Sequence, residues 1–288
     1  MGSNRLGLTL ETPLITLEIA LEELCRLHIH EEIIPEKMRE LVDKMPRDGV
    51  FIHPIIVDSK SLVVLDGMHR VAAAKEIGFR YIPVCFVDYD NPHIQIGCWY
   101  RMFEGLCDAS EAETFFRREG MATTPQSYEA AHDLVEGRRA TTAAFSKDWS
   151  LTAENHAGGI KERYDAIKRI EICLKKAGHR MGYSTDMDAL SKIAAGEYSA
   201  GLMTPTVTKK EVVETALAGK VFSQKTTRHI IPARPMNVNV PIAWLHGEMS
   251  LEEANSRLVD HLTVKRIEKL PPGQILDRRY DEELYVFK

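Results

Sequence analysis

Residues 62–70 read Leu-Val-Val-Leu-Asp-Gly-Met-His-Arg. Four apolar residues that stop at Asp66 and Gly67 are typical of a short buried strand. Apolar side chains then recur at helical spacing over residues 69–77, and Gly78 follows as a C-terminal cap. The segment therefore predicts a strand that turns directly into a helix.

The turn brings polar groups to the start of that helix. The first backbone N–H groups of a helix have no partner within it and lie at the positive end of its dipole, so they attract an anion. Gly67 lets the chain approach closely, and His69 and Arg70 add side-chain donors. Asp66 can hold a metal ion or orient an attacking hydroxyl. The pattern predicts a phosphate site, and the alternative is a helix cap beside a solvated arginine.

The composition is that of an ordinary globular protein, with 288 residues, 44% of them hydrophobic, and a net charge of −5. The negative charge argues against a generally basic surface for nucleic acid. Five cysteines without a CxxC pair leave at least one thiol unpaired, which is typical of a reducing compartment. We find no signal-peptide pattern and no apolar run near the roughly 20 residues that span a bilayer. These features predict a protein of the cytoplasm without nucleic-acid or membrane partners.

Helices and strands alternate in the first third of the chain. Pro35 fits the first turn of a helix that ends near residues 46–49. Residues 50–57 read as an irregular strand broken by Pro54, and residues 82–87 read as another strand. We therefore expect a small mixed α/β domain over residues 1–105, without a long parallel sheet.

Helical patterns dominate the rest of the chain. Residues 106–157 predict connecting helices and loops, and a long helix follows from about residue 160 to Gly178. Two capping boxes precede further helices; they pair Thr208 with Glu211 and Ser250 with Glu253. Residues 238–242 alternate as an edge strand does. A helix-rich α/β domain is expected over residues 106–288.

A second polar segment, residues 225–229, reads Lys-Thr-Thr-Arg-His between two apolar runs. If it is extended, Lys225, Thr227 and His229 share one face, and the two residues between them share the other. Such a strip suits a ligand that carries a carboxylate and a phosphate. The alternative is an exposed loop with two solvated cations. Taken alone, Glu31 could be only part of the acidic start of a helix, and an aromatic such as Trp99 is more often a core residue than part of a ligand site.

Taken together, these segments resemble the free L-serine kinases of the ParB/sulfiredoxin-like superfamily. The matching elements occur in the family's order over roughly residues 14–245: His30-Glu31, Gly-Val-Phe-Ile-His-Pro at 49–54, Asp-Gly-Met-His-Arg at 66–70, Trp99-Tyr100, and residues 221–229. The Asp-Gly-x-His-Arg element indicates the superfamily, and the Lys-Thr-Thr-Arg-His element narrows it to the serine kinases. Residues 237–245 are also similar to the serine kinases of siderophore gene clusters.

The resemblance implies an α+β fold with a mixed-sheet ParB/sulfiredoxin-like N-terminal domain, a helix-rich C-terminal domain that contributes the substrate strip, and an active site in the cleft between them. It implies transfer of a phosphoryl group from ATP or ADP, with Mg²⁺, to the hydroxyl of free L-serine. The product, O-phospho-L-serine, serves the biosynthesis of cysteine or related amino-acid and siderophore precursors.

The resemblance also implies roles for single residues. Glu31 is the implied catalytic base, and Asp66 the implied support for the reacting hydroxyl or the metal. The implied nucleotide-binding residues are Phe51, Ile52, Gly67, Met68, His69 and Arg70. The implied substrate-binding residues are Trp99, Lys225, Thr226, Thr227, Arg228 and His229. The chain departs from relatives at Met68, where some carry a second histidine, and at His53, where others carry a lysine.

Two other classes of protein share part of the pattern. A ParB-like DNA-binding module would keep the phosphate site at Arg70 without needing Glu31 or residues 225–229. A sulfiredoxin-like reductase would need a nucleophilic cysteine in the turn, where Met68 stands. The sequence leaves open the choice of ATP or ADP, the choice between serine and a close hydroxy amino acid, the oligomeric state, and the role of the chain after about Gly247.

Overall fold

The computed structural model describes residues 5–155, 158–276 and 279–288. The chain forms two compact units, and each is assembled from separate stretches of sequence. The first unit contains residues 1–95, 213–221 and 229–288, and the second contains residues 96–212 and 222–228. The division differs from the expected boundary at residue 105, because the C-terminal part of the chain folds onto the N-terminal part.

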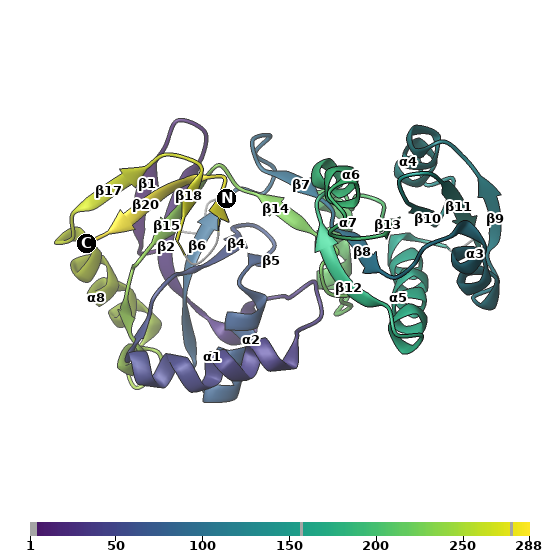
Figure 1. Cartoon of the computed structure of the whole chain (residues 1–288). Coiled ribbons are helices and arrows are strands. Elements are labelled where there is room, and N and C mark those ends of the chain that lie inside the picture. Colours follow the sequence, from purple (N-terminus) through teal and green to yellow (C-terminus); the bar gives the residue numbers. More distant parts are fainter. Residues whose placement is uncertain (1–4, 156–157, 277–278) are drawn as a thin grey trace. The chain divides into compact units, whose positions relative to one another are not determined.

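A five-stranded mixed sheet forms the centre of the first unit (Figure 1). Strands β4 and β6 pair in parallel, and the other neighbours pair antiparallel. This is the small mixed sheet that the start of the sequence predicts. The strands, in sheet order, are β1 (Leu8–Glu11), β2 (Thr16–Glu23), β6 (Tyr81–Val87), β4 (Ile55–Asp58) and β5 (Val64–Asp66).

The two helices predicted near the N-terminus are confirmed. They are α1 (Pro35–Asp48) and α2 (Met68–Ile77), which pack against each other. Each ends at a glycine in the left-handed conformation, Gly49 with φ 68° and Gly78 with φ 85°. Only glycine adopts this conformation without steric cost, so these two residues fix where the helices end. The predicted irregular strand is also present, as β3 (Val50–Phe51) and β4 on either side of the break.

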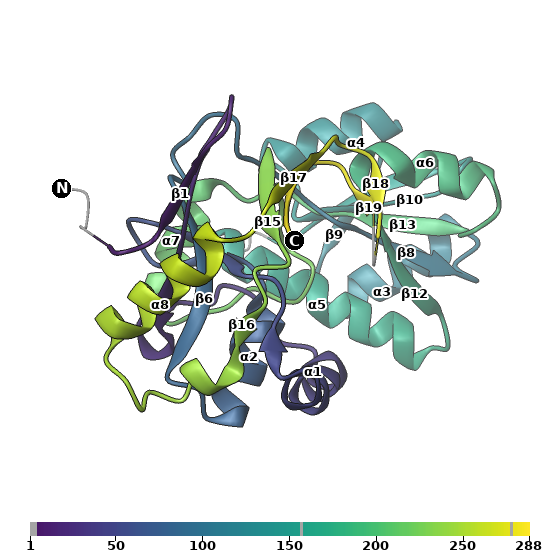
Figure 2. The same cartoon turned by 90° about the vertical axis from the view of Figure 1, so that its left-hand side faces the viewer.

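The chain after Gly247 completes the first unit. Helix α8 (Leu251–Thr263) packs along β1 and β2 (Figure 2), and Ser250 caps it as predicted, by accepting the Glu253 N–H at 3.1 Å. The Asn255 side chain accepts from the Leu21 N–H at 2.7 Å and donates to the Leu21 carbonyl at 3.2 Å. The remaining strands of this region are β15 (Ala233–Met236), β17 (Ile267–Leu270) and β20 (Glu283–Phe287), which form one sheet, and the pair β18 (Gln274–Ile275) and β19 (Arg279–Tyr280).

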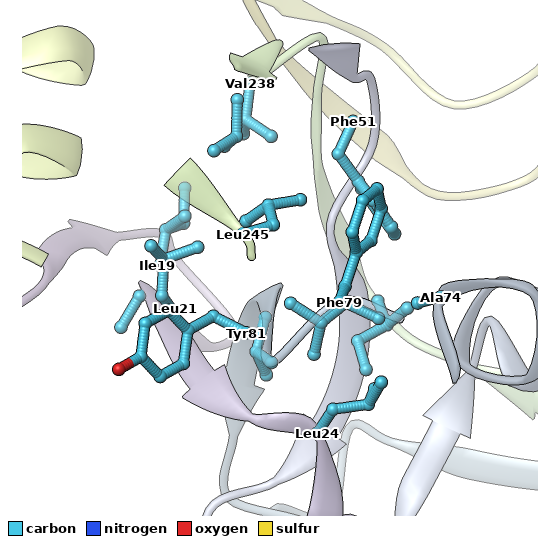
Figure 3. Packing of buried hydrophobic residues seen from close by; sticks show 14 of the residues in the cluster. Ile19, Leu21, Leu24, Phe51, Ala74, Phe79, Tyr81, Val238 and Leu245 are labelled. Atoms are coloured by element: carbon cyan, nitrogen blue, oxygen red, sulfur yellow. The ribbon is translucent and has the colours of Figure 1, made fainter. Parts of the chain in front are cut away.

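The core of the first unit combines residues from both ends of the chain (Figure 3). Ile19 and Leu21 of β2 lie in one cluster with Val238 and Leu245, all almost fully buried. The predicted edge strand over residues 238–242 is shorter than expected. Only β16 (Val240–Pro241) forms, paired with β3, and the short helix η2 (Ile242–Trp244) follows it.

A six-stranded antiparallel sheet forms the centre of the second unit. The prediction of only helices and loops over residues 106–157 is wrong, because β9, β10 and β11 lie there. Strand β10 reads Thr-Ala-Ala-Phe and is buried at every position, so it shows no alternation of polar and apolar residues. The strands, in sheet order, are β12 (Arg180–Ser184), β8 (Tyr100–Glu104), β13 (Ala200–Met203), β10 (Thr142–Phe145), β11 (Ser150–Glu154) and β9 (Ala122–Pro125).

Helices cover both faces of this sheet. Phe103 of β8 lies in a core cluster with residues of α3 and α5, whereas Tyr100 and Met102 lie in a cluster with residues of α4 and α6. Because side chains alternate along a strand, Arg101 shares the face of Phe103, toward α3 and α5. The helices are α3 (Ala109–Arg118), α4 (Tyr128–Glu136), α5 (Ile160–Lys176) and α6 (Asp186–Ala194).

Three elements contain points at which the chain passes from one unit to the other: β7 (Gln95–Gly97), α7 (Lys209–Leu217) and β14 (Arg228–Ile230). The predicted capping box of α7 is confirmed by two reciprocal hydrogen bonds between Thr208 and Glu211, at 2.8 and 3.2 Å. In the part of the chain that the structure describes, none of the helices is long and apolar enough to cross a membrane.

Replacement of Asn255 by alanine is expected to lower the free energy of unfolding by about 2 kcal/mol, because it leaves both buried backbone groups of Leu21 without their partner. Chemical denaturation measures the change. The matched control is Arg257→Ala on the half-exposed side of the same helix, where we expect a loss below about 0.5 kcal/mol. Equal losses in the two variants would show that α8 is not anchored as described.

Candidate active site

The strand-to-helix turn predicted from residues 62–70 is present, from β5 through Gly67 into α2. Gly67 has φ 99°, and a Cβ atom there would lie 2.6 Å from Ile55 Cγ2 and 2.9 Å from Arg70 Nη2. No other residue fits this position without moving its neighbours. Since the N-cap is a glycine, it has no side chain to accept hydrogen bonds from the first N–H groups of α2. The N-terminal end of α2 therefore keeps the backbone N–H geometry that attracts an anion.

Asp66 and Arg70 belong to a chain of four charges within the first unit. Arg70 Nη2 lies 3.0 Å from Asp66 Oδ2, and the buried Arg234 pairs with the same oxygen. Arg234 Nε lies 2.8 Å from Glu282 Oε1. Sequence analysis did not find Arg234 and Glu282, because nothing in their local sequence distinguishes them from other charged residues. The alternating signs make the group neutral as a whole, so it fixes the turn rather than adding net charge to it.

Arg70 is also bound to backbone. Its Nη1 donates to the carbonyls of His53 at 2.6 Å and Pro54 at 2.8 Å. Together with the bond to Asp66, these contacts join the start of α2 to the segment before β4. Arg70 therefore holds the turn in shape, in addition to the role at phosphate that the resemblance implies.

The carboxylate of Asp66 does not fit a metal site in this arrangement, because one of its oxygens is shared by two guanidinium groups. Among residues 5–155, 158–276 and 279–288, no group of three or more His, Cys, Asp or Glu side chains could hold a metal ion. The contacts of Asp66 therefore do not support the expectation that it binds Mg²⁺.

The other implied nucleotide residues differ in exposure. Phe51 lies in the core of the first unit and pairs with β16 (Figure 3). Because its side chain is buried there, these contacts do not support the predicted role of Phe51 beside the nucleotide base. Ile52 is half-buried, and Met68 packs partly against the same core. His69 Nε2 accepts the Ile34 N–H at 3.0 Å, which ties the start of α2 to the chain that follows Glu31.

Glu31 lies in a compact group of polar side chains in the first unit, which we call the Glu31 group: His30, Glu31, Tyr89 and His229. The buried His30 donates from Nδ1 to the Val64 carbonyl at 2.8 Å, and its Nε2 lies 4.0 Å from Glu31 Oε1. The rings of His30 and His229 meet edge to face with centroids 5.3 Å apart. Tyr89 Oη lies 2.6 Å from His229 Nε2. His229 of the second polar segment is thus within the same group as Glu31.

Burial sets the protonation of this group. It lowers the pKa of His30 below its ordinary value of 6.5, although the nearby Glu31 carboxylate acts in the opposite direction. Burial, assisted by Asp58, raises the pKa of the Tyr89 phenol. Both side chains are therefore neutral at pH 7. Glu31 itself is only 7% exposed.

Three other residues of the second polar segment contact Trp99 in the second unit. We call this set the Trp99 group: Trp99, Lys225, Thr227 and Arg228. The Trp99 Nε1–H donates to the Thr227 carbonyl at 3.2 Å. Lys225 Nζ lies 4.7 Å from the centre of the indole, and Arg228 Cζ lies 6.0 Å from it. Both cations are within the range of a cation–π attraction.

The expectation of an extended strip over residues 225–229 is wrong for its first half. Lys225 has φ 60° within a turn, and regular strand begins only with β14 at Arg228. The Thr226 side chain is fully buried, and its hydroxyl donates to the Ser223 carbonyl at 2.8 Å. Thr226 therefore stabilises the turn, and its burial does not support the predicted contact with a substrate.

Arg228 keeps an unused donor. Its Nε atom is buried and has no hydrogen-bond partner in the part of the chain that the structure describes. It lies 3.4 Å from the position that a Cβ atom would occupy on Gly97. An unpaired buried donor on a cation is costly unless an acceptor binds to it, and a carboxylate is the acceptor that a guanidinium suits best.

Curated relatives match most of the chain. An ATP-dependent L-serine kinase of Staphylothermus marinus is 28% identical over 240 residues, which are 80% of this chain and 92% of the relative. An ADP-dependent L-serine kinase of Thermococcus kodakarensis is 25% identical over 228 residues, which are 77% of this chain and 91% of the relative. A ParB-like protein of Sulfolobus acidocaldarius is 26% identical over 205 residues, covering 71% of this chain and 86% of that protein. No family model matches the chain.

Solved structures show the same fold. A mutant free serine kinase in complex with AMP has a TM-score of 0.69 at 23% identity and covers 80% of this chain and 94% of its own. SbnI from Staphylococcus aureus, truncated at its C-terminus, has a TM-score of 0.67 at 16% identity and covers 85% of this chain and 95% of its own. The resemblance to the free L-serine kinases is confirmed.

The neutral His30 predicts a pH dependence of stability. Because its pKa is lowered in the folded protein, the unfolded chain binds a proton at this histidine first as the pH falls through 6.5. Folding is therefore destabilised from pH 6.5 downward to the folded pKa, and His30→Gln should flatten that slope. Denaturant titrations at a series of pH values measure it, and NMR follows the imidazole. An imidazole in the folded protein that titrates at or above 6.5 would contradict the prediction.

Proposed function

We propose that this protein is a nucleotide-dependent kinase that transfers a phosphoryl group from ATP or ADP to the hydroxyl of free L-serine. Similarity to L-serine kinases over about four fifths of the chain supports the proposal. The main geometric support is that Arg228 and His229, which are adjacent in the chain, belong to two different polar groups. Arg228 offers an unused buried donor within the Trp99 group, and His229 belongs to the Glu31 group.

We propose further that the substrate binds at the chain junction of Arg228 and His229. One peptide bond joins Arg228 to His229, so their Cα atoms are about 3.8 Å apart however the units are arranged. The Trp99 group and the Glu31 group thus meet along the chain. A substrate the size of serine could use donors from one group and the carboxylate of the other.

The nucleotide is assigned to the start of α2. Its terminal phosphates would accept hydrogen bonds from the first N–H groups of the helix, with the ring of His69 beside them. Gly67 permits this approach because it has no side chain. Asp66 and Arg70 keep the turn in place through their ion pair, and Arg234 extends that support.

The amino acid is assigned to the other half of the site. The Arg228 guanidinium would bind its carboxylate, and Trp99 and His229 would enclose it. The serine hydroxyl oxygen would attack the terminal phosphorus while the bond from phosphorus to the bridging oxygen breaks, leaving ADP or AMP. Glu31 would accept the hydroxyl proton late in that step, since a carboxylate is too weak a base to remove it beforehand. The product, O-phospho-L-serine, would suit the biosynthesis of cysteine and related compounds.

The direct test is to incubate the purified protein with Mg²⁺, either nucleotide and a panel of hydroxy amino acids, and to identify phosphorylated products by mass spectrometry. We expect O-phospho-L-serine from the native protein. Glu31→Gln should fold normally and lose turnover by about 10² to 10⁴, because the acceptor of the proton is gone.

A surface substitution, Glu113→Gln on α3, serves as the control and should keep full activity. Near-native turnover of Glu31→Gln would remove Glu31 from the role of base. The absence of any phosphorylated amino acid, together with salt-sensitive binding to nonspecific DNA, would instead support a ParB-like binding module.

Arg228→Ala is expected to raise the serine KM by about tenfold to a hundredfold, because it removes a charge-assisted bond to the amino-acid carboxylate. The nucleotide KM should stay within about twofold, since Arg228 is not assigned to the phosphates. Initial rates with either substrate varied give both constants. Arg180→Ala, at an arginine exposed on the second unit, is the control. An unchanged serine KM in Arg228→Ala would show that the Trp99 group is misassigned.

A further inference from the structure

A buried ion pair in the second unit contacts the backbone of the Trp99 group. Arg101 Nε of β8 lies 2.5 Å from Glu171 Oε1 of α5, and the two side chains are 0% and 5% exposed. Sequence analysis singled out neither residue. A buried ion pair contributes little to stability by itself, because removing both charges from water is costly. Since stability alone does not explain the pair, the other contacts of Arg101 point to a second role.

The other donors of Arg101 all reach the backbone around the Trp99 group. Nη1 donates to the Trp99 carbonyl at 2.6 Å and to the Lys225 carbonyl at 3.0 Å, and Nη2 reaches the Gln224 carbonyl at 3.4 Å. One guanidinium thus joins the segment between β7 and β8, which contains Trp99, to the turn that contains Lys225. Glu171 fixes the plane of that guanidinium from the opposite side.

The turn needs such support. Lys225 has φ 60°, a backbone conformation that side-chain-bearing residues adopt rarely and only where surrounding contacts hold it. Further bonds act on the same region. The Tyr164 hydroxyl donates to the Pro205 carbonyl at 2.7 Å and lies 3.5 Å from the Thr226 carbonyl, and Thr204 donates to the Trp99 carbonyl at 3.2 Å. Arg101 is the member of this network that contacts both segments at once.

We propose that Arg101 and Glu171 form a positioning pair that sets the geometry of the serine-binding half of the site. The pair touches no substrate. It holds the carbonyls of Trp99, Gln224 and Lys225, and through them the indole and the two cations beside it. The inference deepens the proposed function and rests on it for the identity of the ligand. A lysine in place of Arg101 would not suffice, because one ammonium group cannot bond to Glu171 and to all three carbonyls in a fixed plane.

The double variant Arg101→Met/Glu171→Leu separates positioning from folding. Apolar side chains of similar size commonly replace a buried ion pair without loss of stability, so the second unit should fold. The three carbonyls lose the hydrogen bonds from Arg101, and we expect the serine KM to rise at least tenfold while the nucleotide KM stays within about twofold. Thr142→Val is the matched control, because it removes a buried hydrogen bond in the same sheet, to the Met203 carbonyl, that involves no residue of the Trp99 group.

Trypsin supplies a readout that does not depend on activity. Cleavage after Lys225 and Arg228 should become at least tenfold faster in the double variant, because the turn loses its anchor, and should stay unchanged in the control. If the double variant fails to fold, Glu171→Gln replaces it, with a smaller rise in serine KM, of about threefold to tenfold, and faster cleavage at the same two sites.

The outcomes are distinct. A folded variant with native serine KM and native cleavage rates overturns the inference. A native protein that forms no phosphoserine overturns the proposed function, and the cleavage rates then decide the positioning role alone. Equal changes in the nucleotide and serine KM values would indicate a general loss of structure and would also overturn the inference.

Discussion

The peptide bond between Arg228 and His229 is the constraint on which the functional interpretation depends. The polar segment it belongs to is divided between two compact units, with residues 222–228 in the second and residues 229–288 in the first. Each side is held by its own unit. Arg228 lies by the indole of Trp99, and His229 packs against His30 and Tyr89. Because the two residues are adjacent in the chain, a single peptide bond connects the Trp99 group to the Glu31 group.

Arginines in ion pairs restrict the backbone in both units. In the first unit Arg234 and Arg70 share one oxygen of Asp66, and in the second unit Arg101 is paired with Glu171. Arg70 and Arg101 also bond to backbone carbonyls, which gives each a planar set of fixed contacts. None of these pairs needs to add net stability. Their effect is to restrict irregular backbone, at the turn before α2 and at the turn of Lys225, to one conformation.

The sequence predicted those parts of the fold that are determined by residues close together in the chain. Gly49 and Gly78 end their helices because only glycine suits their conformation, and the turn at Gly67 follows from the same property. Strands β9 to β11 were missed because they are short and rich in alanine and threonine, which give only a weak apolar signal; β10 is buried at every position, whereas β9 is largely exposed. The C-terminal residues could not be placed, since the contact between Asn255 and Leu21 joins positions far apart in the chain.

The residues of the candidate site also differ in whether the sequence could predict them. Asp66, Gly67 and Glu31 were recognisable from motifs and from the family resemblance, and the structure places them in one unit. The partners that orient them are distant in sequence and chemically ordinary; Arg234 and Tyr89 are examples. Only the fold reveals such partners, because a pairing between distant residues leaves no local pattern.

The most direct measurement is a crystal structure of the protein with AMP and O-phospho-L-serine bound together. We expect the phosphoserine carboxylate at the Arg228 guanidinium, its phosphate between Glu31 and the first turn of α2, and AMP beyond that turn. Phosphoserine bound at a surface remote from Arg228 and Glu31, or bound without contact to either, would contradict the assignment of this chain as a serine kinase with its site at the Arg228–His229 junction.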